Sequence, residues 1–116
     1  MRLHELADLL TLTELTPTTG EVDPNITKGY ASDLLSDVLA NAPSGGVLVT
    51  LQVHLNVIAV AGHAGLAAVI FSAGRKPEED VIAKAAEENI ALFTSPDDTF
   101  DLVGRLYALG IEGGGA

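Results

Sequence analysis

Three short apolar runs stand out in the second half of the chain. They cover residues 47–51, 67–71 and 90–94, and each has the length of a strand that is buried on both faces. After each run the apolar residues recur at helical spacing. Strands that alternate with helices at this spacing predict a small parallel sheet with βαβ crossovers, which is an α/β fold.

The helices expected between these strands carry their own start and stop signals. Residues 55–62 are apolar and Ala-rich, which indicates a buried helix. Pro77, placed in the first turn, and the acids after it indicate the start of a second helix. Residues 95–98 start the last helix and Gly110 ends it. One stripe of the last helix is expected to be apolar: Phe100, Val103, Leu106 and Tyr107.

The first third of the chain has a mixed pattern. Leucines at helical spacing predict a helix over residues 2–11, and alternation predicts an edge strand at 12–15. A short strand is expected at 26–31, followed by a helix that starts at Ser32–Asp33. One face of that helix is expected to carry Leu34, Leu35, Val38 and Leu39. This part is therefore expected to form an N-terminal α+β cap on the sheet.

The chain length and the two ends define the domain organisation. A chain of 116 residues is one domain, and we expect it to cover residues 1–111. Residues 112–116 are Gly-rich and are expected to form a flexible tail. The N-terminus lacks the features of a signal peptide, so we expect a cytoplasmic protein.

Composition excludes several classes of function. The formal net charge of −10 gives no electrostatic footprint for nucleic acid or for an anionic membrane surface. The absence of cysteine excludes disulfides and thiolate metal sites. Residues 47–71 carry no charged side chain, but they contain polar side chains that disfavour a membrane span: Gln52, His54, Asn56 and His63.

The sheet topology indicates where a ligand would bind. In an open parallel sheet, ligands bind beyond the carboxyl ends of the strands. Polar and small residues follow the first two apolar runs at those ends. The candidate ligand-binding residues are Thr50, Gln52, His54, Asn56, Ser72, Ala73, Gly74 and Arg75.

Each candidate also has a purely structural interpretation. His54 is either a ligand contact or general base, or a side chain that hydrogen-bonds the loop backbone. Asn56 either contacts a ligand or caps the following helix, and Gln52 can satisfy loop backbone groups. Arg75 and Lys76 either hold a phosphate or carboxylate near a helix N-terminus, or balance the acids that follow them.

Common catalytic and cofactor motifs are absent. The sequence has no G-x-x-x-x-G-K-[ST] phosphate loop, no G-x-G-x-x-G fingerprint and no G-x-S-x-G nucleophile turn. Its three histidines do not have metal-ligand spacing. We therefore expect no catalytic residues, no cofactor and no metal.

Four segments together resemble the DRTGG domain family, over nearly the whole chain. They are residues 29–42, 50–57, 74–77 and 104–107. Related domains precede the kinase domain of HPr kinase/phosphorylase and lie inside some phosphotransacetylases. The resemblance implies a fold similar to the N-terminal domain of HPr kinase, and a regulatory, often dimeric, ligand-sensing domain that is often compared with CBS domains.

The family motif is only partly present. The Asp-Arg positions fall near Leu51 and Gln52, so that pair is missing. The Thr-Gly-Gly positions become Ser72, Ala73 and Gly74, which keep a hydroxyl group and one glycine. A kinase label for such a chain is misleading, because the phosphate loop belongs to a domain that this sequence lacks.

Three functions remain open. The first is a non-catalytic homodimeric sensor that binds a small anionic metabolite, for example an adenine nucleotide, and signals to a partner protein. The second is a ligand-free module for protein interaction or dimerisation. The third, least supported by the residues, is a small enzyme that uses His54 together with Asp97 or Asp33.

Overall fold

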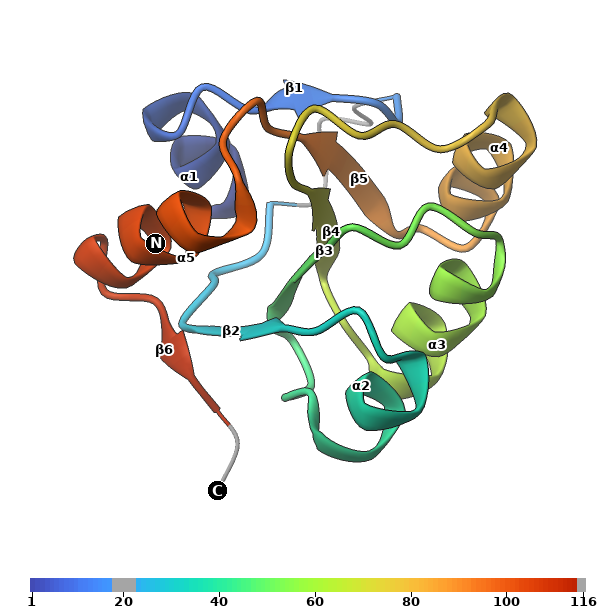
Figure 1. Ribbon diagram of the computed structural model, residues 1–116, viewed down its shortest axis with the longest axis horizontal. Coiled ribbons are helices and arrows are strands. Elements are labelled where there is room, and N and C mark those ends of the chain that lie inside the picture. Colours follow the sequence, from blue (N-terminus) through green and yellow to red (C-terminus); the bar gives the residue numbers. More distant parts are fainter. Residues whose placement is uncertain (18–22, 115–116) are drawn as a thin grey trace.

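The computed structural model describes residues 1–17 and 23–114. A single sheet lies between two layers of helices (Figure 1). The helices are α1 (Leu3–Leu9), α2 (Leu35–Asn41), α3 (Asn56–Ala64), α4 (Glu79–Glu87) and α5 (Thr99–Ala108). The strands are β1 (Thr13–Glu14), β2 (Lys28–Ala31), β3 (Val47–Thr50), β4 (Ala68–Phe71), β5 (Ala91–Thr94) and β6 (Glu112–Gly113).

The sheet is mostly parallel and has the strand order β1-β5-β4-β3-β2-β6. Strands β2 to β5 are sequential neighbours in parallel register, while β1 pairs antiparallel with β5 at one edge. The predicted α/β fold with βαβ crossovers is confirmed. The predicted edge strand is confirmed too, although β1 and β2 are part of the main sheet and not of a separate cap.

Side-chain alternation along the central strands creates two cores. In β3, Val47 and Val49 pack against α1 and α5, whereas Leu48 packs against α2, α3 and α4. All three side chains are at most 2% exposed. Burial on both faces explains why these strands are continuous apolar runs in the sequence.

The course of α5 differs from that of the other connections. Helices α2, α3 and α4 link successive strands on one face, but α5 crosses the opposite face back to β6 at the far edge (Figure 1). There β6 pairs in parallel with β2. Glu112 and Gly113, which the sequence assigns to a flexible tail, are therefore strand residues, because β2 offers them an open edge. Residues 115–116 lie outside the described part of the chain.

Two predicted helix starts are also corrected. Helix α2 begins at Leu35, because the side chains of Ser32 and Asp33 are engaged in the preceding loop. Helix α4 begins at Glu79, so Pro77 precedes the helix and is buried.

The predicted apolar faces of α2 and α5 are wrong in part. In α2, Val38 is fully buried, but Leu34 and Leu39 are 65% and 48% exposed. In α5 the core side is formed by Leu102 and Leu106, while the rest of the predicted stripe points to solvent. Helical periodicity marks both an inner and an outer apolar face here and does not distinguish them.

Candidate functional site

The loops at the carboxyl ends of β4 and β5 are joined directly to each other. The N–H groups of Ala73 and Gly74 donate to the carbonyl oxygens of Asp97 and Ser95, both at 2.7 Å. Ala73 and Gly74 have φ angles of 57° and 68°, and this left-handed turn aims both N–H groups at the neighbouring loop. The crevice expected where the chain changes faces of the sheet is therefore closed by backbone hydrogen bonds.

The hydroxyl groups at the carboxyl ends of β3 and β4 also form hydrogen bonds within the fold. Ser72 is fully buried, and its Oγ lies 2.6 Å from Oγ1 of Thr99 at the start of α5. Thr50 is fully buried, and its Oγ1 donates to Oδ1 of Asp33 at 3.0 Å. Of the predicted ligand residues, Thr50 and Ser72 thus lie beneath the surface and support the loops.

A hollow of about 370 Å³ lies beside this closed crevice, between the loop that follows β3 and the start of α4. Three predicted ligand residues line it: Gln52, His54 and Arg75. Its remaining lining residues are Leu51, Val53, Leu55, Glu78, Asp80 and Val81. Ala73 and Gly74 are exposed but do not line it. The hollow is therefore a small site of mixed polarity at the carboxyl ends of β3 and β4.

Asp33 holds the loop that forms one wall of the hollow. Its Oδ1 accepts hydrogen bonds from Thr50 Oγ1 and from the N–H group of Leu51, the latter at 2.7 Å. The Gln52 side-chain amide donates to the Asp33 backbone oxygen at 3.1 Å. The predicted role of Gln52 in satisfying loop backbone is therefore confirmed. Asp33 as the anchor of this loop was not predicted, because its partners lie 17 and 18 residues away in sequence.

His54 and Asn56 form the start of α3. The N–H group of Asn56 donates to Nδ1 of His54 at 3.0 Å, so this nitrogen accepts from the backbone and does not donate to an orienting carboxylate. The Asn56 side chain does not cap the helix, whose N-cap residue is Leu55. Asn56 lines a neighbouring groove along α3 and not the hollow itself.

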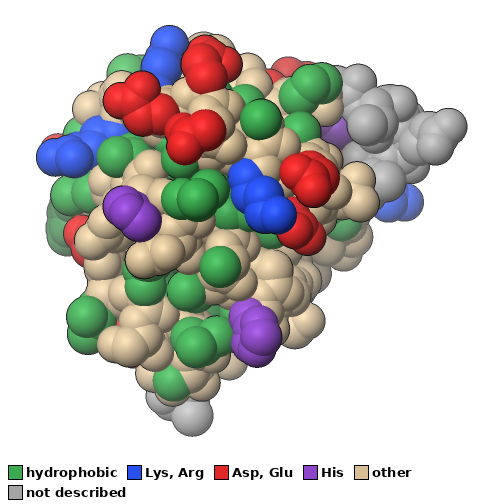
Figure 2. Space-filling view, turned by 90° about the vertical axis from the view of Figure 1, so that its right-hand side faces the viewer, with side chains coloured by type: hydrophobic (Ala, Val, Ile, Leu, Met, Phe, Trp, Pro, Cys, Tyr) green, Lys and Arg blue, Asp and Glu red, His purple; other side chains and the backbone are tan. Residues whose placement is uncertain are grey.

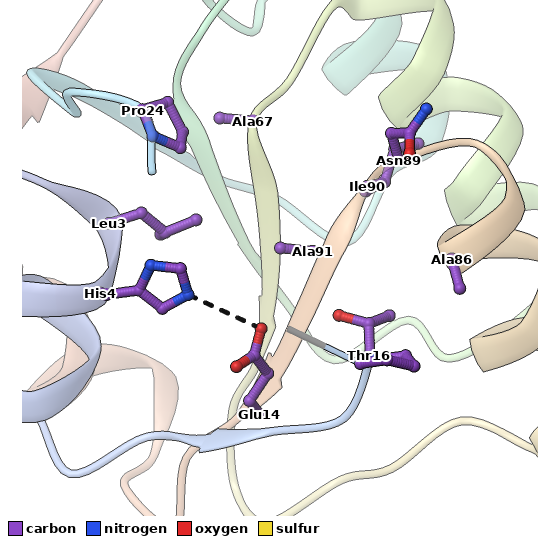
Figure 3. A pocket seen from close by; sticks show the side chains of 11 residues that line it. Leu3, His4, Glu14, Thr16, Pro24, Ala67, Ala86, Asn89, Ile90 and Ala91 are labelled. Atoms are coloured by element: carbon purple, nitrogen blue, oxygen red, sulfur yellow. Dashed lines mark ion pairs between the residues drawn. The ribbon is translucent and has the colours of Figure 1, made fainter. Parts of the chain in front are cut away.

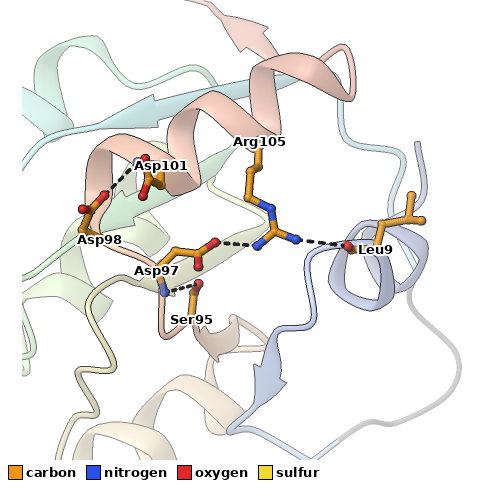
Figure 4. Close-up of polar contacts among 6 residues, drawn as sticks. All are labelled: Leu9, Ser95, Asp97, Asp98, Asp101 and Arg105. Carbon is orange, nitrogen blue, oxygen red and sulfur yellow. Dashed lines mark hydrogen bonds and ion pairs between the residues drawn. The ribbon is translucent and has the colours of Figure 1, made fainter.

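The carboxylates of the enzyme hypothesis are engaged elsewhere. Asp33 binds Thr50 and Leu51, and Asp97 forms an ion pair with Arg105 on α5 (Figure 4). In the described part of the chain, neither is paired with His54. In the described structure, His54 therefore has neither Asp33 nor Asp97 as an orienting acid.

Charges of both signs surround the hollow. Arg75 and Lys76 are exposed, and within residues 1–17 and 23–114 neither side chain forms an ion pair. Glu78 and Asp80 lie on the same hollow, and Oδ1 of Asp80 accepts from the N–H group of Val81 at 3.0 Å. Figure 2 shows the face formed by α2, α3 and α4, where hydrophobic side chains lie between charged groups of both signs. The guanidinium of Arg75 is thus the cationic group of the hollow.

A second hollow, of about 270 Å³, lies at the opposite end of the sheet (Figure 3). It is mostly apolar and lies among α1, β1 and the end of α4. At its edge, Nδ1 of His4 is 3.0 Å from Asp23 and Nε2 is 4.0 Å from Glu14. The backbone N–H group of His4 lowers the pKa of Asp23, and the His4 side chain adds to this effect. Reasoning from strand ends did not predict this hollow, because it lies at the amino ends of β4 and β5.

Two features of the described residues bear on the class of site. The described residues contain no cluster of His, Cys, Asp and Glu that could hold a metal ion. Among the described helices, none combines the length and apolarity needed to cross a membrane.

Comparisons with known proteins bear on the fold. No protein-family model matches the sequence, and no curated protein matches it either. The structure is similar to the crystal structure of the CBS and DRTGG domains of the regulatory region of Clostridium perfringens pyrophosphatase, complexed with its activator, diadenosine tetraphosphate. The TM-score is 0.72 at 17% sequence identity, and the match covers 94% of this chain and 46% of that one. This chain, which spans about half the length of that regulatory region, therefore has a DRTGG-like mixed α/β fold, similar to a CBS or DRTGG domain.

Proposed function

We propose that the chain is a regulatory, ligand-sensing domain that binds a small anionic metabolite, such as an adenine nucleotide, in the hollow beside Arg75. The observation that carries the proposal is the position of this hollow at the carboxyl ends of parallel strands, with three predicted ligand residues around it. The similar regulatory region was crystallised with a nucleotide activator, which supports the choice of ligand class.

The mixed polarity of the hollow favours a nucleotide over a bare phosphate. Arg75 offers paired N–H donors for a phosphate group. Glu78 and Asp80 can accept from ribose hydroxyls or from an adenine amino group, but they repel additional negative charge. Val53 and Leu55 provide apolar surface for a ring.

The proposal includes a mode of action. The domain acts as a homodimer in the cytoplasm, and ligand binding alters its contact with a partner protein. It has no catalytic activity of its own, and it needs no cofactor. Gln52, His54 and Arg75 line the hollow and face the ligand, and Asn56 lies in the adjoining groove along α3. Thr50, Ser72, Ala73 and Gly74 support the ligand loops from beneath or beside the hollow.

Thermal unfolding in the presence of AMP, ADP, ATP, diadenosine tetraphosphate and inorganic phosphate tests the proposal. A nucleotide at a hundred times its Kd stabilises the fold by about 2.7 kcal/mol, which for a chain of this size raises the Tm by several degrees. We expect a shift with nucleotides, and a much smaller shift with phosphate.

Two matched variants locate the binding. Arg75→Ala is expected to remove most of the nucleotide-induced shift, whereas Lys76→Ala removes an adjacent exposed cation that does not line the hollow and leaves the shift intact. An unchanged Tm with every nucleotide contradicts the proposal. An equal loss of the nucleotide-induced shift in both variants shows that binding depends on the overall charge and not on this hollow.

The ligand-free interaction module remains the second candidate. The exposed apolar side chains on α5 favour it, because a contiguous apolar surface of this kind is typical of a docking site. Unchanged unfolding with all nucleotides, combined with self-association, is the result expected of that function.

A further inference from the structure

The outward face of α5 is apolar. Phe100 is 88% exposed and Tyr107 is 65% exposed, although the chain contains only three Phe and two Tyr residues. Val103, at 36% exposure, lies between them on the same side of the helix, and Gly104 is exposed beside it. We call Phe100, Val103, Gly104 and Tyr107 the α5 patch. It lies opposite Leu102 and Leu106, which pack into the core, so within residues 1–17 and 23–114 the patch is left uncovered.

Gly104 has no role within the single chain that explains it. It lies inside α5, where glycine is less favourable than alanine. A Cβ atom at this position would meet nothing within 4 Å, and the residue does not have the positive φ angle that requires glycine. A glycine on an exposed helix face allows the backbone of another helix to approach closely.

The patch is arranged symmetrically along the helix. An aromatic residue stands at each end, at positions 100 and 107, and Val103 and Gly104 form the centre. A two-fold axis at that centre turns the patch onto itself and places Phe100 of one copy near Tyr107 of the other. Such self-complementarity is what an interface between two identical subunits requires.

From this arrangement we propose that the α5 patch is a homodimer interface, in which two α5 helices cross antiparallel at Val103 and Gly104. This proposal rests on the homodimer included in the proposed function, but not on ligand binding. All four patch residues are uncharged in a chain of net charge −10, so the patch itself adds no like-charge contact between two copies.

The exposed area of the patch fits a weak dimer. An aromatic side chain buries about 150–250 Å², so at the observed exposures the four rings of two copies contribute roughly 450–750 Å². With Val103 and the flanking helix surface, the total approaches about 1,000 Å², the lower bound of a specific interface. We expect dissociation constants in the micromolar range.

Sedimentation velocity over a range of protein concentrations, without ligand, tests the interface. We expect a monomer–dimer equilibrium that Phe100→Ser and Tyr107→Ser each weaken by at least about tenfold. Leu34→Ser is the matched control, because Leu34 is as exposed as Tyr107 (both 65%) but lies before α2. A chain that stays monomeric at millimolar concentration overturns the proposal, and so does a dimer that Leu34→Ser weakens as much as the α5 variants do.

Two further variants distinguish close helix contact from general apolar association. Gly104→Ala is expected to raise the Tm of the dilute monomer and to weaken dimerisation, because the added methyl group favours the helix but fills the crossing point. The chain has no cysteine, so Val103→Cys introduces a single thiol that should cross-link between copies, whereas Leu34→Cys should not. A dimer that Gly104→Ala tightens, or cross-linking only at position 34, contradicts the antiparallel crossing. None of these readouts depends on Arg75 or a nucleotide, so failure of the interface leaves the proposed ligand binding standing, and failure of ligand binding leaves the interface standing.

Discussion

At the scale of single residues, Asp33 connects β2 with the loop after β3. One carboxylate oxygen accepts from both Thr50 and the Leu51 N–H group, and the Asp33 backbone oxygen accepts from Gln52. These hydrogen bonds fix the first residues of a loop that also carries His54 into the hollow. Asp33 is therefore a positioning residue for the candidate site.

Replacing Asp33 is expected to weaken both the fold and the site. Asp33→Ala removes two hydrogen bonds at a partly exposed position and should lower the free energy of unfolding by about 1–2 kcal/mol. It should also reduce the nucleotide-induced rise in Tm. Asp33→Asn is the control, because an amide oxygen can still accept from Thr50 and Leu51. Urea unfolding measures both variants, and equal losses in the two contradict the positioning role.

Tyr30 and Asp37 form a second interaction that responds to pH. The Tyr30 hydroxyl donates to both carboxylate oxygens of Asp37, at 2.8 and 2.9 Å, and the Asn41 amide donates to Oδ1. Hydrogen bonds from Asn41 first, and then from Tyr30, hold the pKa of Asp37 below its ordinary value of 3.8. The hydrogen bond to Asp37 raises the pKa of Tyr30 above its ordinary value of 10.0.

The two shifts define a pH window for this contact. A lowered carboxyl pKa stabilises the fold above its ordinary value, and that stability is lost as the pH falls through the folded-state pKa. A raised tyrosine pKa stabilises the fold below 10.0, and that stability is lost as the pH rises through the folded-state pKa. Wild type should therefore exceed Tyr30→Phe in Tm between about pH 4 and 10. A difference in Tm that stays constant from pH 2 to pH 11 contradicts this explanation.

At the scale of elements, the start of α5 stabilises both the helix and the loops beside the candidate site. Asp98 is its N-cap, and the side chain accepts from the N–H group of Asp101 at 2.8 Å (Figure 4). The residues just before it hold the turn after β4 through backbone hydrogen bonds. The start of α5 thus stabilises the helix and closes the crevice beside the hollow.

Removal of this cap should destabilise the helix measurably. Asp98→Ala is expected to cost about 1 kcal/mol in the free energy of unfolding, as other N-cap substitutions do. Asp98→Asn keeps a capping oxygen and should lose much less. Chemical denaturation of both variants at a protein concentration that keeps the chain monomeric gives the comparison. Equal destabilisation by the two would show that charge, and not capping, is what matters at Asp98.

The central strands could be predicted from the sequence, whereas the faces of the helices could not. The runs at 47–51, 67–71 and 90–94 are apolar because both sides of each strand are buried. In α5, by contrast, Phe100 and Leu102 belong to two different apolar faces, and periodicity alone cannot say which one faces the sheet. The stripe of α5 that was wrongly predicted to face the core contains three residues of its outer patch, namely Phe100, Val103 and Tyr107.

The candidate site could be predicted in location but not in detail. The rule that ligands bind at carboxyl ends of parallel strands identified Gln52, His54 and Arg75, which line the hollow. It did not reveal that the N–H groups of Ala73 and Gly74 are used by a neighbouring loop. Contacts between residues about 20 apart are set by tertiary packing, which local sequence patterns do not encode.

At the scale of the whole molecule, the first and last strands along the chain form the two opposite edges of the sheet. Strand β1 pairs with β5, and β6 pairs with β2, with two residue pairs each. Between them, β2 to β5 are built from successive local connections and have three or four residue pairs at each junction. The central strands are therefore buried and paired over more residues, while the two edge strands are paired over only a few.

Because the edge strands are paired over few residues, we expect them to open at a lower free-energy cost than the central strands. Opening β1 or β6 breaks few hydrogen bonds, so the amide protons of Leu15, which donates to Leu92, and of Glu112, which donates to Thr27, should exchange with solvent through local fraying. The amides of Val49 and Ile70 lie between paired strands and should exchange only when the domain unfolds globally. The sheet thus has a stable centre of four strands, β2 to β5, and two edge strands that open readily. When β1 or β6 detaches, the edge of β5 or β2 is exposed, and a β-segment of another chain can pair with it.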